Sequence, residues 1–424
     1  MRKLLCLILK ILVTNIFLIS CEENNDGTLQ VIEIAGNIDN FKPFKLSDLD
    51  AELEYVVLKT TSNSMLLDIR FIDLSDDYVL VSDRDKCLLF DRNGNFISRI
   101  GKQGRGPGEN SAFTQVKILN DKIFLPDGLT HTINVYNTEG EFINSIKSPG
   151  EFDVLISNDW MPKTDSSFLV NIPNHTGHEE LRIAKINNNG EIIKKFANTT
   201  FFSSHINRGC RHNRQSYFYI QESNLYFKNF LNDTIWQIND DHLDPVYVLN
   251  LGQHGFSFEH KTLDYLSYLK KLYEGIFIEK IFGGGDYLWL NIDFLTHYPL
   301  NFRRPYVHPA FGDEREENYK IIGLFNKKKD DFFLVAPSNI KEQLEPTGIE
   351  NDIDGGINFM PRYAVNDKLI VSWFEAYQLK MYVASEAFKN STPKFPEKKK
   401  ELEELAASLD ENDNPVLMLV KLKE

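Results

Sequence analysis

The residues best suited to chemistry form two basic clusters in a chain whose formal net charge is −14. One cluster lies in the stretch 205-HINRGCRHNR-214 and the other is an Arg-Arg pair, and together they supply His205, Arg208, Arg211, His212, Arg303 and Arg304. Arginine binds carboxylates through two parallel hydrogen bonds, so each cluster is a candidate site for an anion or a uronate. The alternative is that both are loops whose cations pair with neighbouring acids.

A glycine-rich stretch, 101-GKQGRGPGEN-110, has the composition of a phosphate-binding loop but not its order of residues. A nucleotide-binding loop opens a helix, and its lysine is followed by Ser or Thr. Here Gln103 follows Lys102, and Pro107 interrupts the row of backbone amides. We therefore interpret the stretch as a tight connection between two β elements, in which the glycines supply positive φ.

Known catalytic and metal-binding signatures are absent from the sequence. It contains no GxSxG, HExxH or C-x-x-C pattern. A metal site requires three or four converging ligands, whereas the histidine-containing loop 173-PNHTGHEE-180 offers two or three. We therefore expect neither a metal nor a cofactor.

The composition excludes one class of partner and favours β structure. With 47 Lys and Arg residues against 61 Asp and Glu residues, the surface repels phosphate backbones, so we expect no nucleic-acid partner. The chain has 31 Phe and 17 Tyr residues, and aromatic side chains pack well on a pleated surface.

The N-terminus has the features of an export signal. Three cations, Arg2, Lys3 and Lys10, precede an apolar run, residues 11–19, which is too short to span a bilayer and fits a secretory signal. The run ends in Leu-Ile-Ser-Cys, which resembles a bacterial lipobox, so we expect residues 1–20 to be removed and Cys21 to carry lipid. Residues 21–29 then form an acidic tether. The alternative is an ordinary signal with an incidental cysteine.

Two thiols, Cys87 and Cys210, remain in the rest of the chain. An oxidising compartment would permit a disulfide between them, but the sequence leaves open whether their Cα atoms approach.

Short apolar runs that alternate with polar turns indicate a repeat of β-hairpins. The turn glycines Gly94, Gly140 and Gly190 each separate two apolar runs, and they stand 46 and 50 residues apart. Repeats of about 40–50 residues with several strands each are typical of β-propeller blades. Blades stack around an axis because no blade can bury both of its faces alone.

We therefore predict an all-β fold, a six-bladed β-propeller over residues 30–424, with seven blades as the alternative count. Later strand runs at 216–249, 287–335 and 369–422 supply blades four to six. The early run at residues 30–34 would have to join the last blade to close the ring.

Two segments, 262–277 and 396–411, space their leucines as an amphipathic helix does, and we predict them as short helical insertions. The glycine-rich loop follows the first clear blade. Because a connection between blades lies near an axial face, Arg105 and Glu109 are candidates for the mouth of the axial channel.

The assembled pattern resembles the six-bladed β-propeller lipoproteins of Bacteroidetes, which are related to NHL-type propellers. The acidic residues after Cys21 are similar to those that favour export to the cell surface in such lipoproteins. The resemblance implies an outer-membrane location, at the cell surface or else on the periplasmic face, and a role near glycan uptake systems. It is carried by the stretches 104–109, 232–236, 354–356 with Phe359, and 413–423.

Two functions from different classes fit these features. The first is a binding or scaffold module for a glycan, a peptide or an outer-membrane partner protein, which the missing catalytic motifs and the abundant aromatics favour. The alternative is a propeller enzyme, either a glycan lyase or hydrolase or an NHL-like lyase, with its site at the mouth of the axial channel. The fold alone does not exclude catalysis.

Overall fold

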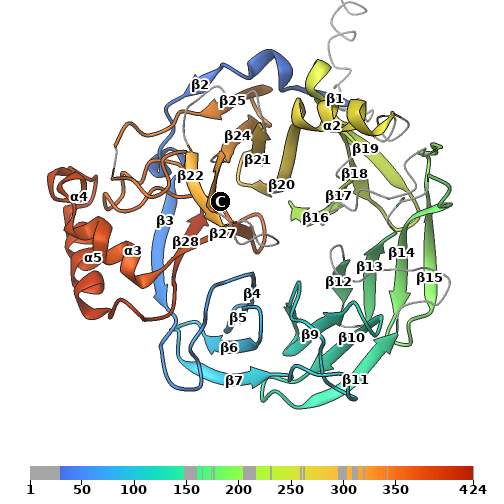
Figure 1. The fold of residues 1–424 in the computed structure, drawn as a ribbon, viewed down its shortest axis with the longest axis horizontal. Coiled ribbons are helices and arrows are strands. Elements are labelled where there is room, and N and C mark those ends of the chain that lie inside the picture. The colour runs from blue at the N-terminus through green and yellow to red at the C-terminus, as the bar shows by residue number, and fades with distance from the viewer. Residues whose placement is uncertain are drawn as a thin grey trace, which may run out of the picture.

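Six β-sheets surround a common axis and close into a ring, as Figure 1 shows in the view along that axis. The computed structural model of the chain describes residues 29–423 except 148–159, 165, 173, 175–176, 204–215, 230–231, 258–259, 261–262, 295–302, 308–313, 319 and 341. The fold is therefore the predicted six-bladed β-propeller, and the alternative count of seven blades is wrong.

Blades 1 to 3 are antiparallel meanders whose strands run outward from the axis in chain order. Their central strands are buried almost throughout, whereas the outermost strands alternate or are exposed. The strands are β4 Phe71–Leu74, β5 Tyr78–Ser82, β6 Cys87–Asp91 and β7 Phe96–Ile100 in blade 1; β8 Lys117–Leu119, β9 Lys122–Asp127, β10 Thr132–Tyr136 and β11 Phe142–Lys147 in blade 2; β12 Trp160–Thr164, β13 Ser167–Asn171, β14 Leu181–Asn187 and β15 Ile192–Ala197 in blade 3.

Blades 4 and 5 each gain a fifth strand from the N-terminal segment. Strand β1, Gln30–Glu33, pairs in parallel with β19, and β2, Phe41–Lys42, pairs in parallel with β25. A separate hairpin of β22, Arg303–Val307, and β23, Glu314–Asn318, is inserted between β21 and β24. The other strands are β16 Ser216–Gln221, β17 Asn224–Asn229, β18 Thr234–Ile238 and β19 Leu243–Asn250 in blade 4; β20 Ile276–Gly284, β21 Tyr287–Phe294, β24 Ile321–Asn326 and β25 Asp331–Val335 in blade 5.

Blade 6 closes the ring with a strand from the N-terminal part of the chain. Its outermost strand β3, Ala51–Val57, pairs antiparallel with β28 along its whole length. The expectation that residues 30–34 close the last blade is wrong, because they form β1 at the edge of blade 4. An alternating pattern identifies a half-buried strand but not the sheet edge that accepts it. The other strands of blade 6 are β26 Tyr363–Ala364, β27 Leu369–Phe374 and β28 Val416–Leu422.

The three turn glycines contact the neighbouring blade as well as forming turns. Gly94, Gly140 and Gly190 have φ angles of 76°, 85° and 78°, in the region that favours glycine. A Cβ atom on Gly94 would lie 1.8 Å from the carbonyl oxygen of Val57 at the end of β3, and one on Gly190 would lie 1.9 Å from that of Lys147 at the end of β11. Each hairpin therefore lies against the outermost strand of the preceding blade.

The glycine-rich loop 101–110 connects β7 of blade 1 to β8 of blade 2, in line with its interpretation as a tight connection. The hydroxyl of Tyr136 in blade 2 donates to the side-chain oxygen of Asn110 at 2.7 Å. Gly108, with φ 70°, lies against the ring of Phe142. These contacts attach the loop to the blade that it introduces.

Helices lie at the edge of the ring. α2, Tyr265–Tyr273, and α5, Pro396–Ser408, fall within the two predicted segments, so both helical insertions are confirmed. Two more helices, α3, Ala376–Ala384, and α4, Glu386–Asn390, were not predicted. With α5 they form a helical insertion between β27 and β28 that lies outside blade 6 (Figure 1). Short 3-10 turns are η2 Ala35–Asn37, η3 Leu46–Leu49 and η4 Gly252–His254.

Aromatic side chains fill much of the space within and between blades. Phe124 of blade 2 and Phe168 of blade 3 pack edge to face, with their ring centroids 5.3 Å apart. In blade 5 the rings of Phe282 and Trp289 stack at 5.9 Å. The aromatic-rich composition thus serves the core, and only part of it is available for a ligand.

Candidate functional site

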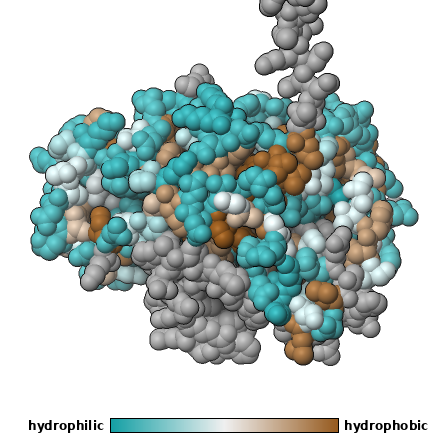
Figure 2. Space-filling model, turned by 90° about the horizontal axis from the view of Figure 1, so that it is seen from above, coloured by the Kyte–Doolittle hydropathy of each residue, from teal (hydrophilic) through white to brown (hydrophobic). Residues whose placement is uncertain are grey.

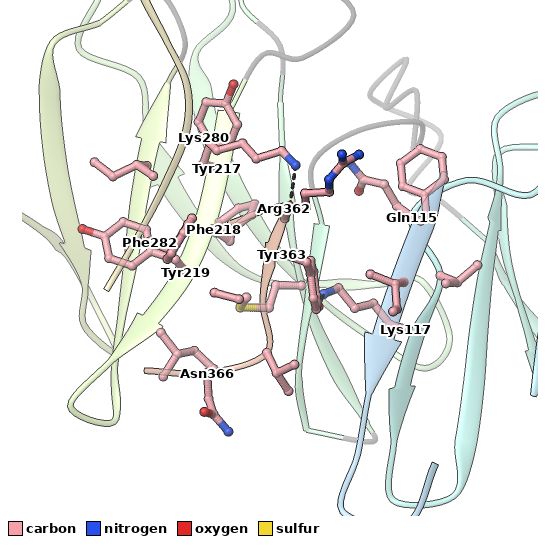
Figure 3. A pocket seen from close by; sticks show the side chains of 18 of the residues that line it. Gln115, Lys117, Tyr217, Phe218, Tyr219, Lys280, Phe282, Arg362, Tyr363 and Asn366 are labelled. Atoms are coloured by element: carbon pink, nitrogen blue, oxygen red, sulfur yellow. Dashed lines mark hydrogen bonds between the residues drawn. The ribbon is translucent and has the colours of Figure 1, made fainter. Parts of the chain in front are cut away.

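The innermost strands of all six blades enclose a cavity of about 230 Å³ on the axis of the ring, which we call the axial cavity. Figure 3 shows side chains from several of these strands converging on it. Since every blade contributes to its wall, the cavity exists only in the closed ring. It is lined by residues 70–72, 115–117, 160–161, 217–220, 280–282, 362–366 and Trp373.

The lining of the axial cavity carries charge of one sign. Four cations, Arg70, Lys117, Lys280 and Arg362, line it, whereas none of the described lining residues is an aspartate or a glutamate. The whole chain, by contrast, is acidic, and hydrophilic residues cover much of the described surface on the face that Figure 2 shows. Low-dielectric walls lined by one sign of charge focus the field and attract ligands of the opposite sign.

Aromatic rings make up much of the remaining wall. They come from blades 1, 3, 4, 5 and 6, so a ligand in the cavity would meet rings from several directions. Ring faces pack against planar groups and against the apolar faces of sugars. The aromatic lining residues are Phe71, Trp160, Tyr217, Phe218, Tyr219, Phe282, Tyr363 and Trp373.

A chain of hydrogen bonds, which we call the axial triad, joins blades 1, 2 and 6 at the cavity wall. The ammonium of Lys117 donates to the hydroxyl of Tyr363 at 2.6 Å, and this hydroxyl donates to Asp73 at 2.6 Å. Lys117 also forms an ion pair with Asp73 at 3.9 Å. Asp73 itself is buried and accepts the backbone N–H of Ile118 at 2.9 Å, which fixes its orientation.

A second group of cations lies where blades 5 and 6 meet. The ammonium of Lys280 donates to the backbone carbonyl of Arg362, as the dashed line in Figure 3 shows. The guanidinium of Arg362 forms an ion pair with Glu345 at 2.7 Å and lies 5.2 Å from the ring centroid of Trp373. Its Nε is buried without a hydrogen-bond partner in the described part of the chain.

Two tyrosines of the lining are held in their protonated form. Burial, and then the neighbouring Asp73, raises the pKa of Tyr363 well above its ordinary value. Burial, and then Tyr247 and Tyr226, raises the pKa of Tyr219 in the same way. Both phenols therefore act as neutral hydrogen-bonding groups, and neither is suited to be a general base near neutral pH.

The structure places the predicted mouth residues Arg105 and Glu109 outside the lining of the axial cavity. Arg105 is exposed, and the carboxylate of Glu109 accepts the backbone N–H of Gly106 at 2.9 Å, so it stabilises its own loop. Their part in ligand binding stays a prediction.

The other predicted site residues fall partly or wholly outside the described structure. His205, Arg208, Arg211, His212 and the predicted lipidation site Cys21 lie outside the described residues. Arg303 and Arg304 belong to β22, where their backbones pair with Asn318 and Glu317, and their side chains are not described.

Whether Cys87 and Cys210 pair stays open, because Cys210 lies outside the described residues. Cys87 is buried in blade 1, and burial raises the pKa of its thiol.

The cavity residues were missed because they are dispersed along the sequence rather than clustered. Arg70, Lys117 and Arg362 each stand at or directly before the start of an innermost strand. Innermost strands run in the same direction, so their first residues meet at one end of the axis. Aligning the starts of the predicted blades, rather than searching for local clusters, would have found them.

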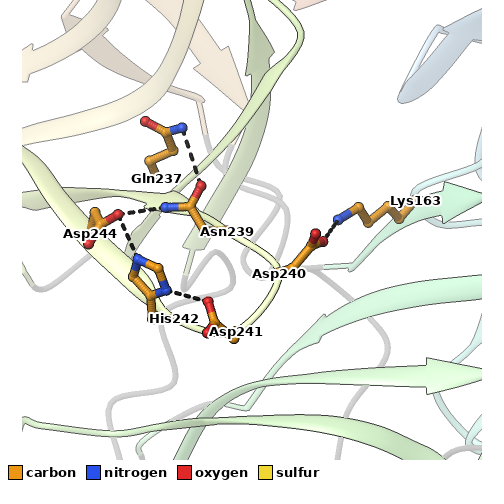
Figure 4. Close-up of polar contacts among 7 residues, drawn as sticks. All are labelled: Lys163, Gln237, Asn239, Asp240, Asp241, His242 and Asp244. Atoms are coloured by element: carbon orange, nitrogen blue, oxygen red, sulfur yellow. Dashed lines mark hydrogen bonds and ion pairs between the residues drawn. The ribbon is translucent and has the colours of Figure 1, made fainter.

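Other polar features lie away from the axis. The hairpin between β18 and β19 groups His242 with Asp241 and Asp244, and it is exposed to solvent (Figure 4). Among the described residues, no group of three or more His, Cys, Asp or Glu side chains could hold a metal ion. Two open grooves of about 660 and 860 Å³ lie beside β3 and the helical insertion, and acids and cations are mixed in both.

The fold and its cavity define the class of protein: a six-bladed β-propeller with a cationic, aromatic-lined cavity on its axis. More particularly, the chain belongs to the family described as a domain of unknown function, DUF4934, which matches residues 29–421. The match includes all six blades. A comparison with curated proteins found no match.

Two solved structures are similar to the chain at low sequence identity. A protein of Bacteroides fragilis, described as exported, is 17% identical with a TM-score of 0.64, over 94% of this chain and 100% of that chain. A member of the DUF4221 family from Bacteroides vulgatus is 13% identical with a TM-score of 0.47, over 88% of this chain and 98% of that chain. The first likeness supports the propeller fold, whereas the lipoprotein and NHL-type parts of the predicted resemblance stay predictions.

Proposed function

We propose that the protein is a binding module that takes a small ligand into the axial cavity. The observation that carries this proposal is the make-up of the lining, to which all six blades contribute and whose described residues include rings and cations but no carboxylate. Pockets that bind small molecules combine apolar and aromatic walls with a few placed polar groups. A glycan residue or a peptide side chain is a ligand of suitable size.

The same lining favours binding over catalysis. No His, Cys, Ser, Asp or Glu is among the described residues that line the cavity, so the usual nucleophiles and proton acceptors are missing from it. Lys117 donates to the hydroxyl of Tyr363 at 2.6 Å and lies 3.9 Å from Asp73, so its Nζ already has partners in the wall of the cavity.

We also propose that the protein is exported and held at the outer membrane by lipid on Cys21. The export signal, the lipobox-like sequence and the acidic tether support this location, and the Bacteroides fragilis protein of the same fold is described as exported. Among the described residues, no helix has the length and hydropathy needed to cross a bilayer. A Cys21→Ala variant should leave the membrane fraction, and its retention there after a salt wash would contradict a lipid anchor.

The binding proposal is tested by filling the cavity. Ile220 lines the cavity and is 40% exposed. Ile220→Trp therefore places an indole ring in the axial cavity without disturbing the core. Ile97, 42% exposed on the outermost strand of blade 1, gives the matched control Ile97→Trp. The wild-type protein is screened by thermal shift against monosaccharides, uronic acids, aromatic acids and dipeptides.

A ligand that binds the folded state raises its stability according to its concentration and affinity. We expect the affinity for every stabilising compound, measured by calorimetry, to be at least tenfold lower in Ile220→Trp than in the wild type. The affinity of Ile97→Trp should equal that of the wild type. Equal affinity of the wild type and Ile220→Trp would overturn the proposal.

A further inference from the structure

Two positively charged side chains are buried in the described part of the chain, and they differ in what neutralises them. Arg182 of β14 is 6% exposed, and Lys228 of β17 is 2% exposed. Lys228 has a counter-charge, because the carboxylate of Asp233 opposes the lowering of its pKa that burial causes. Burial lowers the pKa of Arg182 to about 10, and no described carboxylate opposes this, so the guanidinium remains charged at neutral pH without a counter-charge.

The guanidinium of Arg182 connects blades 3 and 4 through neutral partners. Its Cζ lies 4.1 Å from the ring centroid of Trp236, which belongs to β18 of blade 4. Its Nη2 donates to Thr199 at 3.0 Å, Thr200 at 3.1 Å and Asn198 at 3.4 Å. Because all of these hydrogen bonds start from Nη2, Nε and Nη1 donate to no group among the described residues. The ring face and the neutral oxygens reduce the cost of burial, but they leave the positive charge uncompensated.

A small pocket lies beside this guanidinium where blades 3 and 4 meet, and we call it the interblade pocket. Its volume is about 10 Å³, close to the space that one water molecule needs. The occupant must therefore be a single water molecule or a monatomic ion, because sulfate, phosphate and carboxylates are too large. None of the lining residues is acidic; they are Ile172, Asn174, Arg182, Asn198, Asn229 and Asn232.

The lining offers both donors and an acceptor that lack protein partners. The Oδ1 of Asn232 accepts the backbone N–H of Thr234 at 2.8 Å, so the Nδ2 of Asn232 is available to a ligand. The Nδ2 of Asn174 donates to the carbonyl of Thr200 at 2.6 Å, whereas its Oδ1 is buried without a hydrogen-bond partner among the described residues. The free donors suit water and anions alike, but the oxygen of Asn174 suits water alone.

Charge decides between a water molecule and an anion. Water would satisfy the oxygen of Asn174 and accept from Arg182, but it would leave the charge of the guanidinium uncompensated. An anion would neutralise this charge and leave one amide oxygen unpaired. An isolated charge costs far more to bury than an amide group does, so the balance favours the anion.

We infer that the interblade pocket binds a halide ion, held by Arg182 of blade 3 and Asn232 of blade 4, and that this ion joins the two blades. The site is separate from the axial cavity, so the inference goes beyond the proposed binding function. A ligand that binds the folded state stabilises it according to its concentration, and chloride should therefore stabilise the protein.

The first experiment identifies the occupant of the interblade pocket. The mature protein is crystallised with sodium chloride, and diffraction data are collected at a long wavelength, where chloride scatters anomalously and water does not. We expect an anomalous difference peak in the pocket beside the guanidinium of Arg182. Density without anomalous scattering, as a water molecule gives, or a pocket without density would overturn the inference.

The second experiment measures binding in solution. The protein is purified in sodium gluconate, whose anion is too large for the pocket, and its unfolding temperature is measured while chloride replaces gluconate at constant ionic strength. We expect the temperature to rise in the wild type and in Arg99→Met, an exposed control on β7, and the rise to be lost in Arg182→Met. A wild type without this rise would show binding at crystal concentration only and would overturn the inference.

A near-isosteric variant covers the case in which Arg182→Met does not fold. Asn232→Asp keeps the acceptor for the N–H of Thr234 and places a negative charge at the pocket, so it should supply the missing counter-charge and abolish the chloride dependence. Ile220→Trp fills the axial cavity instead and should keep this dependence. Chloride dependence that survives in Asn232→Asp, or that Ile220→Trp removes, would overturn the assignment to the interblade pocket.

Discussion

Two tyrosine–aspartate pairs have the same chemistry and differ in their surroundings. At the axial cavity Tyr363 donates to Asp73 at 2.6 Å, and beside the helical insertion Tyr55 donates to Asp354 at 2.9 Å. Burial, and then the partner carboxylate, raises the pKa of both tyrosines well above the ordinary value. The first pair also accepts a hydrogen bond from Lys117 and borders the axial cavity, whereas the second lies outside that cavity and has a buried carboxylate.

The pair of Tyr55 and Asp354 belongs to a group of hydrogen bonds that we call the buried network. It is formed by Tyr55, Asn351, Asp354 and the backbone of Gly356. Asp354 is 2% exposed and accepts from Asn351 at 2.7 Å and from the N–H of Gly356 at 2.8 Å. Helix α5 packs so closely on this turn that a Cβ atom on Gly356 would lie 2.8 Å from Leu402. The network thus joins β3, the ring-closing strand, to the helical insertion.

A hydrogen-bonded tyrosine and aspartate can thus belong either to a ligand-binding site or to a structural support, and the residue types alone do not distinguish the two. The buried network satisfies its own polar groups, so it stabilises the fold and has nothing left for a ligand. The axial triad uses the same groups but borders the axial cavity, near Nε of Arg362 and Nε1 of Trp160, which have no hydrogen-bond partner among the described residues. Substitutions at the two places should therefore affect different measurements.

The largest effect is expected from Asp354→Ala. It leaves the hydroxyl of Tyr55, the amide of Asn351 and one backbone N–H without their acceptor, and each such loss costs about 1–3 kcal/mol. We expect the free energy of unfolding in urea to fall by about 3 kcal/mol or more, while the affinity for a cavity ligand stays unchanged in the folded protein. Asp76→Ala, at an exposed turn, is the control. A loss below about 1 kcal/mol would mean that water replaces the carboxylate.

A matched pair of Tyr→Phe variants sharpens the comparison. Tyr55→Phe should lower the free energy of unfolding by about 1–2 kcal/mol, since it removes a donor from a buried carboxylate. Tyr363→Phe should cost less than about 1 kcal/mol, because Lys117 is already 3.9 Å from Asp73 and water in the cavity can take the place of the hydroxyl.

Ligand affinity should follow the opposite order. Tyr363→Phe changes the wall of the cavity and should alter the affinity measured by calorimetry, whereas Tyr55→Phe should leave it unchanged. If Tyr55→Phe lowered the affinity for the ligand and Tyr363→Phe did not, the Tyr55 pair would belong to the binding site and the Tyr363 pair to the structural support.

The pH dependence of stability gives a smaller effect with a defined sign. Burial raises the pKa of Asp354 in spite of its hydrogen bonds from Gly356, Tyr55 and Asn351. For Asp127, burial is also the largest single influence and raises the pKa. The hydrogen bonds that Asp127 accepts from Ser111, Leu129 and Thr130 together outweigh burial, so the pKa is lowered. The two carboxyls therefore have opposite linkage to protons.

A raised folded-state pKa contributes stability that is present at acid pH and lost as the pH rises through that pKa, and a lowered one does the reverse. The stability difference between the wild type and Asp354→Asn should thus be larger at pH 4 than at pH 7. For Asp127→Asn the difference should be larger at pH 7. Urea unfolding at both pH values measures the four differences, and the same sign for both variants would refute the assigned directions.

The sequence was informative where a local pattern has a single structural solution. The Asn-Gly turn at Gly94 and its equivalents require positive φ and recur at blade spacing, so the propeller could be predicted. The route of the N-terminal segment could not be predicted, because β1 and β3 have similar apolar patterns. Only tertiary pairing decides which sheet edge each of these strands joins.

The site was harder to predict for the same physical reason. Arg362 and Lys280 are far apart in the sequence and become neighbours only when blades 5 and 6 stack. The locally dense basic cluster that contains Arg208 and Arg211 lies outside the described residues. The Asp354-Gly355-Gly356 stretch is one of those that carry the family resemblance, and in the structure it holds the helical insertion.

The smallest effect is expected at the hairpin between β18 and β19 (Figure 4), which has polar partners but neither burial nor a cavity. His242 contacts Asp241 at 2.5 Å and Asp244 at 3.0 Å, and the hydrogen bond that its ring donates to Asp241 is the main cause that raises its pKa. A raised histidine pKa contributes stability only at acid pH and loses it as the pH rises. Solvent screens exposed pairs strongly, so this contribution is small even there.

We therefore expect His242→Ala to leave the unfolding midpoint at pH 7 and the affinity of a cavity ligand unchanged within error. Lys163→Ala, which removes an ion pair of 3.1 Å with Asp240 of the same hairpin, is the matched control and should behave alike. A loss of stability comparable to that of Asp354→Ala would show that polar contacts matter here irrespective of burial. A loss of ligand affinity would move the site from the axis to the edge of the ring.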